Sequence, residues 1–162
     1  MKAPLKTIIV CIFILNAFLV KADPVLEIQS PNQKISFTIQ YKNGNEDGLF
    51  YAVKYDNQSV VELSKLGISC NGDNWNKQLV LESSPVQSHD TTWTPIYGER
   101  DRVRDNYNES VISITREGRK FPVLQLIVRA YDSGIAFRYK FATNENGGPY
   151  LHITGESTEF NF

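Results

Sequence analysis

Apolar and polar residues alternate with a period of two along much of this chain, and this pattern most constrains its fold. Residues 35–41 read Ile-Ser-Phe-Thr-Ile-Gln-Tyr, and residues 135–141 read Ile-Ala-Phe-Arg-Tyr-Lys-Phe. Successive side chains of a strand point to opposite faces, so each stretch predicts a strand with one buried face. Residues 123–128 are almost continuously apolar, which is typical of a strand covered on both faces. Shorter runs predict further strands at 25–29, 49–55, 59–63, 66–69, 79–82, 110–115 and 151–154.

Turn signals separate these runs at hairpin spacing. They are Asp56-Asn57, Glu117-Gly118 and Asp132-Ser133-Gly134, residue types that tight turns favour. From residue 23 onward, no window of eleven or more residues keeps the 3.6-residue period of a helix. About ten short strands with regularly spaced turns favour an all-β fold, an antiparallel sandwich.

Residues 1–22 have the pattern of a secretory signal peptide. Lys2 and Lys6 provide a positive start, and residues 7–20 are mostly apolar. Small residues at the positions read by a signal peptidase place cleavage between Ala22 and Asp23. The apolar run is shorter than the ~20 residues of a membrane-spanning helix, although an N-terminal transmembrane helix is the alternative. We therefore expect an exported protein, periplasmic or secreted, with no membrane anchor after processing and one domain over residues 23–162.

Charge and cysteine content exclude several classes of function. Processing removes three lysines and leaves 14 basic against 18 acidic residues, a net charge of −4. An acidic domain gives no reason to expect a nucleic-acid partner. Cys70 is the single cysteine that remains, so an internal disulfide is excluded, and we expect it to be buried near a strand end. His89 and His152 lie far apart in the sequence without metal-ligand spacing, so no metal site or cofactor is expected.

The segment from Trp93 to Glu109 is the main candidate for binding, because it crowds aromatic and charged residues between strand-like runs. Loops on a rigid β scaffold often carry binding groups. Aromatic rings that stack on sugars, with polar side chains that bond hydroxyls, would make a carbohydrate site. The candidate substrate-binding residues are Trp93, Tyr97, Glu99, Arg104, Asn106 and Asn108.

An alternative assigns the same segment a structural role. Trp93 and Tyr97 would then close one end of the sandwich, and Arg102 or Arg104 would pair with Glu99. Carboxylate pairs such as Glu99 with Glu109, or Asp101 with Asp105, could in principle serve glycoside cleavage. Eighteen acidic residues make such pairs easy to find by chance, and the sequence has no Gly-x-Ser-x-Gly nucleophile elbow. We assign no catalytic residue.

The order of several sequence blocks resembles the N-terminal region of glycoside hydrolase family 97, exported bacterial α-glucosidases and α-galactosidases. The blocks, which span nearly the whole mature chain, are Ser30-Pro31-Asn32, Ser64-Lys65-Leu66-Gly67-Ile68, Thr92-Trp93-Thr94-Pro95-Ile96-Tyr97-Gly98-Glu99, Arg104-Asp105-Asn106-Tyr107-Asn108-Glu109, Asp132-Ser133-Gly134-Ile135-Ala136-Phe137-Arg138-Tyr139 and Glu156–Phe160.

The resemblance implies a β-supersandwich, similar to galactose mutarotase domains, packed against a catalytic (β/α)₈ barrel. It also implies a calcium ion in the full-length enzyme, with catalytic and calcium-binding residues that match no position here. By this reading the sandwich is incomplete at its C-terminal end. We expect a non-catalytic part of an α-glycosidase that supports the active-site cleft and carbohydrate binding. Two alternatives are a free-standing carbohydrate-binding β-sandwich module and, with less support, an exported structural sandwich such as an adhesion domain.

Overall fold

The computed structural model describes residues 25–44, 47–70, 73–74, 77–118, 124–141 and 152–162. The expected signal peptide and its cleavage between Ala22 and Asp23 lie outside these residues. Among the residues described, no helix is long and apolar enough to cross a bilayer.

The first sheet is an antiparallel meander of four strands, in the order β1 (Val25–Gln29), β2 (Ile35–Lys42), β3 (Gly48–Tyr55) and β4 (Gln58–Leu66). The predicted turn at Asp56-Asn57 joins β3 to β4 with positive φ at both residues, 47° and 65°. That geometry suits a two-residue hairpin because it follows the right-handed twist of the strands. The strand predictions at 25–29, 35–41 and 49–55 are confirmed.

The second sheet is antiparallel and has the order β11-β10-β9-β7, with β8 also paired to β9. Its strands are β7 (Leu79–Ser83), β8 (Gln87–Trp93), β9 (Val103–Arg116), β10 (Leu124–Tyr131) and β11 (Gly134–Phe141). A third, small sheet has the order β12-β5-β6 and contains β5 (Ile68–Cys70), β6 (Asp73–Asn74) and β12 (Ile153–Glu156). Cys70 is buried at the end of β5, as expected.

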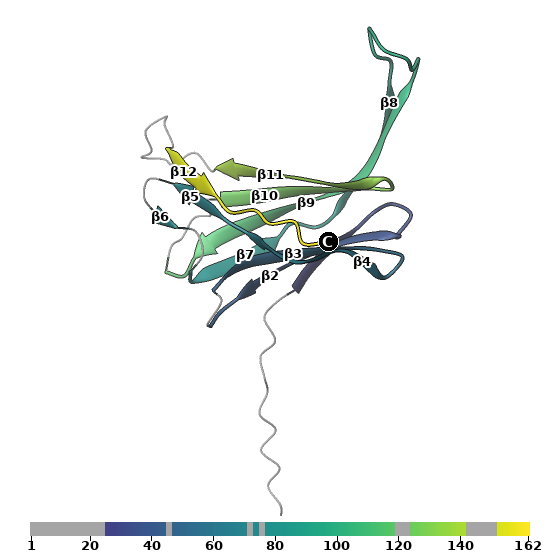
Figure 1. Ribbon diagram of the computed structural model, residues 1–162. Helices are drawn as coiled ribbons and strands as arrows, with labels where there is room; N and C mark the ends of the chain where they lie inside the picture. Colours follow the sequence, from purple (N-terminus) through teal and green to yellow (C-terminus); the bar gives the residue numbers. More distant parts are fainter. Residues whose placement is uncertain (1–24, 45–46, 71–72, 75–76, 119–123, 142–151) are drawn as a thin grey trace, which may run out of the picture.

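The core lies between the first two sheets, which form two layers in Figure 1. Alternate residues of β2 and β10 face each other there, and Phe37, Ile39, Leu126 and Val128 are 0% exposed. Phe37 stacks on Tyr51 with ring centroids 5.6 Å apart. The alternation in the sequence is therefore the alternation of core and surface, and the all-β antiparallel prediction is confirmed.

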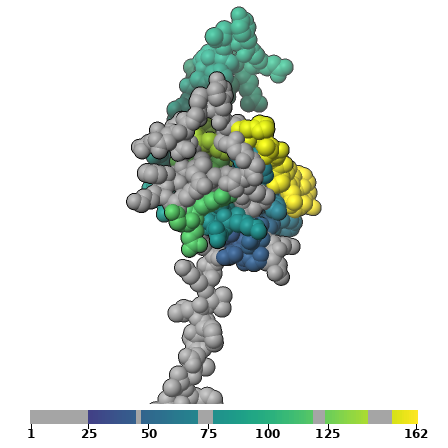
Figure 2. All heavy atoms as spheres, turned by 90° about the vertical axis from the view of Figure 1, so that its left-hand side faces the viewer, coloured from purple at the N-terminus to yellow at the C-terminus, as the bar shows by residue number. Residues whose placement is uncertain are grey.

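The C-terminal segment 157–161 runs along the outer edge of β4 and continues the pairing of β12 with β5. The amides of Ser157 and Glu159 donate to the carbonyls of Gly67 and Lys65, both at 2.9 Å, and the Glu62 amide donates to the Asn161 carbonyl at 2.7 Å. Part of the edge of the first sheet is thereby covered. Figure 2 shows this end of the chain, in yellow, on the surface of the molecule.

One prediction is wrong. Residues 93–109 are not a single loop between strands, because β8 ends at Trp93 and β9 begins at Val103. Only residues 94–102 connect the two strands. Together β8, this connection and the first half of β9 form a projection, residues 87–109, which we call the arm; its root, residues 107–109, also pairs with β10, and beyond that point it is two-stranded. Figure 1 shows it standing clear of the two layers.

Candidate functional site

The arm leaves the body where the partner of β9 changes. The 14-residue β9 pairs first with β8 and then with β7 along the same edge. Between these partners, the Ser84 amide donates to the Val111 carbonyl at 2.8 Å, and the Ser84 hydroxyl accepts from the Val111 amide at 2.9 Å. Pro85 follows and has no amide hydrogen to donate. The hydrogen-bond ladder along this edge of β9 thus ends with the two bonds of Ser84, is broken at Pro85, and begins again with β8.

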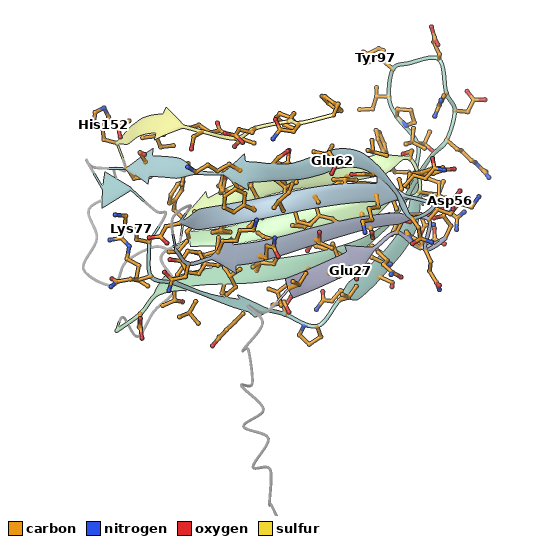
Figure 3. The ribbon with its side chains drawn as sticks, turned by 60° about the horizontal axis from the view of Figure 1, so that its bottom comes forward. Glu27, Asp56, Glu62, Lys77, Tyr97 and His152 are labelled. Atoms are coloured by element: carbon orange, nitrogen blue, oxygen red, sulfur yellow. The ribbon has the colours of Figure 1, made fainter. Side chains whose placement is uncertain are left out.

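The tip of the arm exposes its apolar side chains. Trp93 is 53% exposed, Ile96 90% and Tyr97 91%, and Figure 3 shows Tyr97 at the end of the arm, directed away from the sheets. The alternative that Trp93 and Tyr97 close one end of the sandwich is therefore wrong. The strands of the arm carry both side chains away from the core.

The alternation of side chains along a strand places the six candidate binding residues on different sides of the arm. In the β8–β9 register Thr92 faces Arg104, Asp90 faces Asn106 and Ser88 faces Asn108. Alternate residues share a face of the ribbon, so Arg104, Asn106 and Asn108 lie on one face. Trp93 pairs with Val103 and lies on the other face, while Tyr97 and Glu99 belong to the exposed connection. The six residues therefore do not converge on one site.

Arg104 forms a two-point ion pair with Asp90 across the arm. Its Nε and Nη2 atoms donate to the two carboxylate oxygens of Asp90 at 2.7 and 2.6 Å. This hydrogen bonding, with a smaller effect of the positive charge, lowers the pKa of Asp90 below its ordinary value of 3.8. The structural alternative had Arg102 or Arg104 pairing with Glu99, but Arg104 pairs with Asp90 instead. Both partners are more than half exposed, so the pair fixes geometry more than it adds stability.

Asn108 ties the arm to the first sheet. Its side-chain nitrogen donates to the Gln29 carbonyl at the end of β1 at 2.8 Å, and its side-chain oxygen accepts from the Ser88 hydroxyl at 2.7 Å. The amide is thus engaged on both sides and acts as a positioning group for the arm.

A cluster on the second sheet, which sequence reasoning missed, supports the root of the arm. Tyr107 is only 7% exposed, and its ring lies 4.8 Å from that of His89 and 5.1 Å from that of Tyr131. The Arg129 guanidinium lies 4.4 Å from the Tyr107 ring centroid and donates from Nε to Glu109 at 2.6 Å. This hydrogen bond raises the pKa of Arg129.

The second site on the molecule is an apolar cavity of about 390 Å³ between the two main sheets. We call it the β4–β11 cavity. Side chains from β3, β4 and β11 line it, together with the C-terminal segment, and they include Val53, Val60, Val61, Ile135, Phe137 and Phe160. Val60 is 46% and Phe160 58% exposed, so the cavity is open to solvent. Nothing in the local sequence indicated it, because the lining comes from strands that are distant in the chain.

Both sites present surfaces suited to contact with another molecule or with another part of the protein. Glu109 of the candidate acidic pair is engaged by Arg129. Within the described parts of the chain, no group of three or more His, Cys, Asp or Glu side chains is placed to hold a metal ion. The arm presents aromatic and apolar surface, and the β4–β11 cavity presents a hollow lined by core-type residues.

Comparison with known families and structures agrees with this architecture. The family model described as Glycosyl-hydrolase 97 N-terminal matches residues 28–162. A Glycoside Hydrolase Family 97 enzyme from Pseudoalteromonas sp. strain K8, solved in complex with panose, is 26% identical with a TM-score of 0.71. The same enzyme solved with acarbose gives the same values. A beta-arabinopyranosidase is 27% identical with a TM-score of 0.72.

The extent of the matches is uneven. The similarity covers 83% of this chain but 20% of the Pseudoalteromonas enzyme, and 85% of this chain but 21% of the beta-arabinopyranosidase. The chain thus spans about one fifth of the length of the solved proteins that it matches.

Proposed function

This chain belongs to the glycosyl-hydrolase 97 N-terminal family, and from this we propose that it serves as the non-catalytic β-sandwich part of an exported glycoside hydrolase that acts on α-linked oligosaccharides. Its role is to support the active-site cleft beside a catalytic barrel and to assist carbohydrate binding. We also propose that the complete domain is a galactose mutarotase-like supersandwich, and that the catalytic groups and any calcium ligands come from other parts of the enzyme.

The observation that carries this proposal is the shared fold with an enzyme solved in complex with panose and with acarbose. That likeness spans 83% of this chain. Glycoside cleavage requires two suitably spaced carboxylates, and Glu109 of the candidate pair Glu99–Glu109 is held by Arg129. The exposed aromatic tip of the arm is the natural candidate for contact with the cleft or with sugar.

A chimera tests the proposal. Residues 28–162 would replace the matching fifth of the Pseudoalteromonas enzyme, and acarbose binding would be measured by calorimetry. We expect the dissociation constant to stay within about tenfold of the unmodified enzyme, which corresponds to about 1.4 kcal/mol. The full chain alone should neither bind acarbose nor hydrolyse panose. A folded chimera that loses all acarbose binding, or an isolated chain that hydrolyses panose, would contradict the proposal.

The role of the arm is tested in the same chimera. Loss of an aromatic contact is worth about 0.5–1.5 kcal/mol, so Trp93→Ala and Tyr97→Ala should each weaken acarbose binding by about two- to tenfold. Ile153→Ala is the matched control, because Ile153 is similarly exposed, 51%, on β12. Equal effects in all three variants would remove the arm from the binding function.

The second candidate function is a free-standing carbohydrate-binding module, which the exposed Trp93 and Tyr97 favour. Titration of the full chain with panose and other malto-oligosaccharides separates the two functions. Heat of binding that disappears in folded Trp93→Ala would establish the module and overturn the supporting role.

A further inference from the structure

The β4–β11 cavity has the composition of an interior but lies open. Phe137 contacts both Phe37 and Tyr51 of the core, at centroid distances of 6.0 and 5.6 Å, and it also lines the cavity. The apolar core therefore continues without a boundary into an open hollow. A lining with so few polar groups does not suit a sugar, because sugar sites need polar groups that fix the ligand's hydroxyls.

The edge of β4 is shaped toward this cavity. Between Tyr51 and Val53 the partner on β4 changes from Ser64 to Val61, and between Val53 and Lys54 it changes from Val61 to Ser59. Each step adds one extra residue to β4, which is a β-bulge. Bulges redirect side chains, and here the adjacent Val60 and Val61 both line the cavity. In a regular strand they would point to opposite faces.

Backbone pairing leads along the same edge toward the cavity. The C-terminal segment bonds to Gly67, Lys65 and Glu62 in turn, and Ser64 accepts from the Asn161 amide at 3.0 Å. Next along β4 come Gln58–Val61. Among the described residues, these four have no backbone hydrogen bond on this outer side. An extended segment placed there would continue the antiparallel pairing and would lie over the hollow.

We propose that the β4–β11 cavity is the docking site for an extended polypeptide segment from the remainder of the enzyme. The segment would lie antiparallel to Gln58–Val61 and insert a large apolar side chain between Val60 and Ile135. This inference rests on the proposed function, because it assumes that the domain works within a longer enzyme. It has the form of β-strand addition, in which main-chain bonds supply affinity and a pocket supplies specificity.

A peptide-binding experiment on the full chain tests the proposal. The probe is a synthetic peptide of about ten residues, the length of one strand. Its sequence is that of the Pseudoalteromonas enzyme immediately after the position aligned with Phe162. We expect binding that slows hydrogen exchange at the amides of Gln58–Val61. A charge in the hollow should exclude the apolar anchor, so Val60→Asp should weaken binding at least tenfold.

Val80→Asp is the matched control. Val80 is also a half-exposed valine, 45% against 46% for Val60, but it lies on β7, away from the cavity. The control should leave peptide binding unchanged. Absence of binding to the folded chain, or equal loss in the two variants, would overturn the proposal. A concentration-dependent dimer that Val60→Asp abolishes, without any effect of the peptide, would assign the cavity to a second copy and also overturn it.

If the full chain or a variant is insoluble, the docking site can be tested in the chimera by its melting temperature. There Val60→Asp should lower the melting temperature by several degrees more than Val80→Asp, and equal shifts would contradict docking. The two proposals fail in different measurements. If the chimera loses acarbose binding while hydrogen exchange at Gln58–Val61 stays slow, the proposed function is contradicted. If acarbose binding is retained but Val60→Asp and Val80→Asp have equal effects, only the docking site is contradicted.

Discussion

The body and the arm use the same kinds of residue for opposite purposes. In the body, Phe37 and Tyr51 are 0% and 1% exposed and pack between two sheets. In the outer part of the arm, beyond its pairing with β10, Trp93 and Tyr97 are 53% and 91% exposed. Two-stranded ribbons are marginally stable in water, so the arm depends on its root, where Tyr107 and Asn108 attach it to the body. Aromatic content therefore identifies core in one region and surface in the other.

The largest difference in unfolding free energy between the two regions should come from truncating one aromatic side chain in each. Phe37→Ala removes a fully buried ring and should cost about 3–5 kcal/mol of unfolding free energy. Tyr97→Ala, at the tip of the arm, should change it by no more than about 0.5 kcal/mol. Urea unfolding of both variants measures the difference. Similar losses would mean that the tip of the arm is packed in solution.

The root of the arm should give an intermediate effect. Tyr107→Leu keeps apolar volume but removes the ring contacts with His89 and Tyr131 and the contact with the Arg129 guanidinium. The loss should be about 1–3 kcal/mol. Hydrogen exchange should accelerate more at residues 88–92 than in β2. Uniform acceleration across the chain would show that arm and body unfold as one unit.

The smallest effect should come from acidification of the arm. The pKa of Asp90 is lowered in the folded protein by its hydrogen bonds with Arg104. A lowered pKa means that the ion pair contributes fully above the ordinary value of 3.8 and is lost as the pH falls through the lower folded-state value. NMR titration should show the Arg104 Nε signal change in that acidic range. In Asp90→Asn the change should be absent, and a persistent change would assign the titration to another carboxylate.

The body was predictable because several of its strands bury one face more deeply than the other. Residues 35–41 and 135–141 record that difference as alternation, and both became strands. The β8 strand could not be found in this way, because Gln87–Trp93 is mainly polar and exposed along both faces. A strand without a buried side leaves no period in its sequence.

The candidate binding residues were adjacent in the chain but not in space. Trp93 and Arg104 lie on opposite faces of the arm because of their parity in the register, which the sequence does not reveal without the exact turn length. The β4–β11 cavity was also hidden, because it depends on how β4 and β11 approach each other across the sandwich. Local patterns predict strands, whereas sites that form between strands require the three-dimensional arrangement.

Ser84 and Pro85 lie between β7 and β8, the two strands that pair with successive parts of β9. The two parts of β9 are therefore constrained by different neighbours. Residues 112–116 of β9 pair with β7 and pack on the core, whereas residues 103–106 pair with β8 alone and residues 107–109 pair with both β8 and β10. Insertions or deletions in the connection 94–102 can therefore lengthen, shorten or redecorate the arm without disturbing the packing of the body. The surface that the arm presents to a partner can therefore change in evolution while the sandwich keeps its structure.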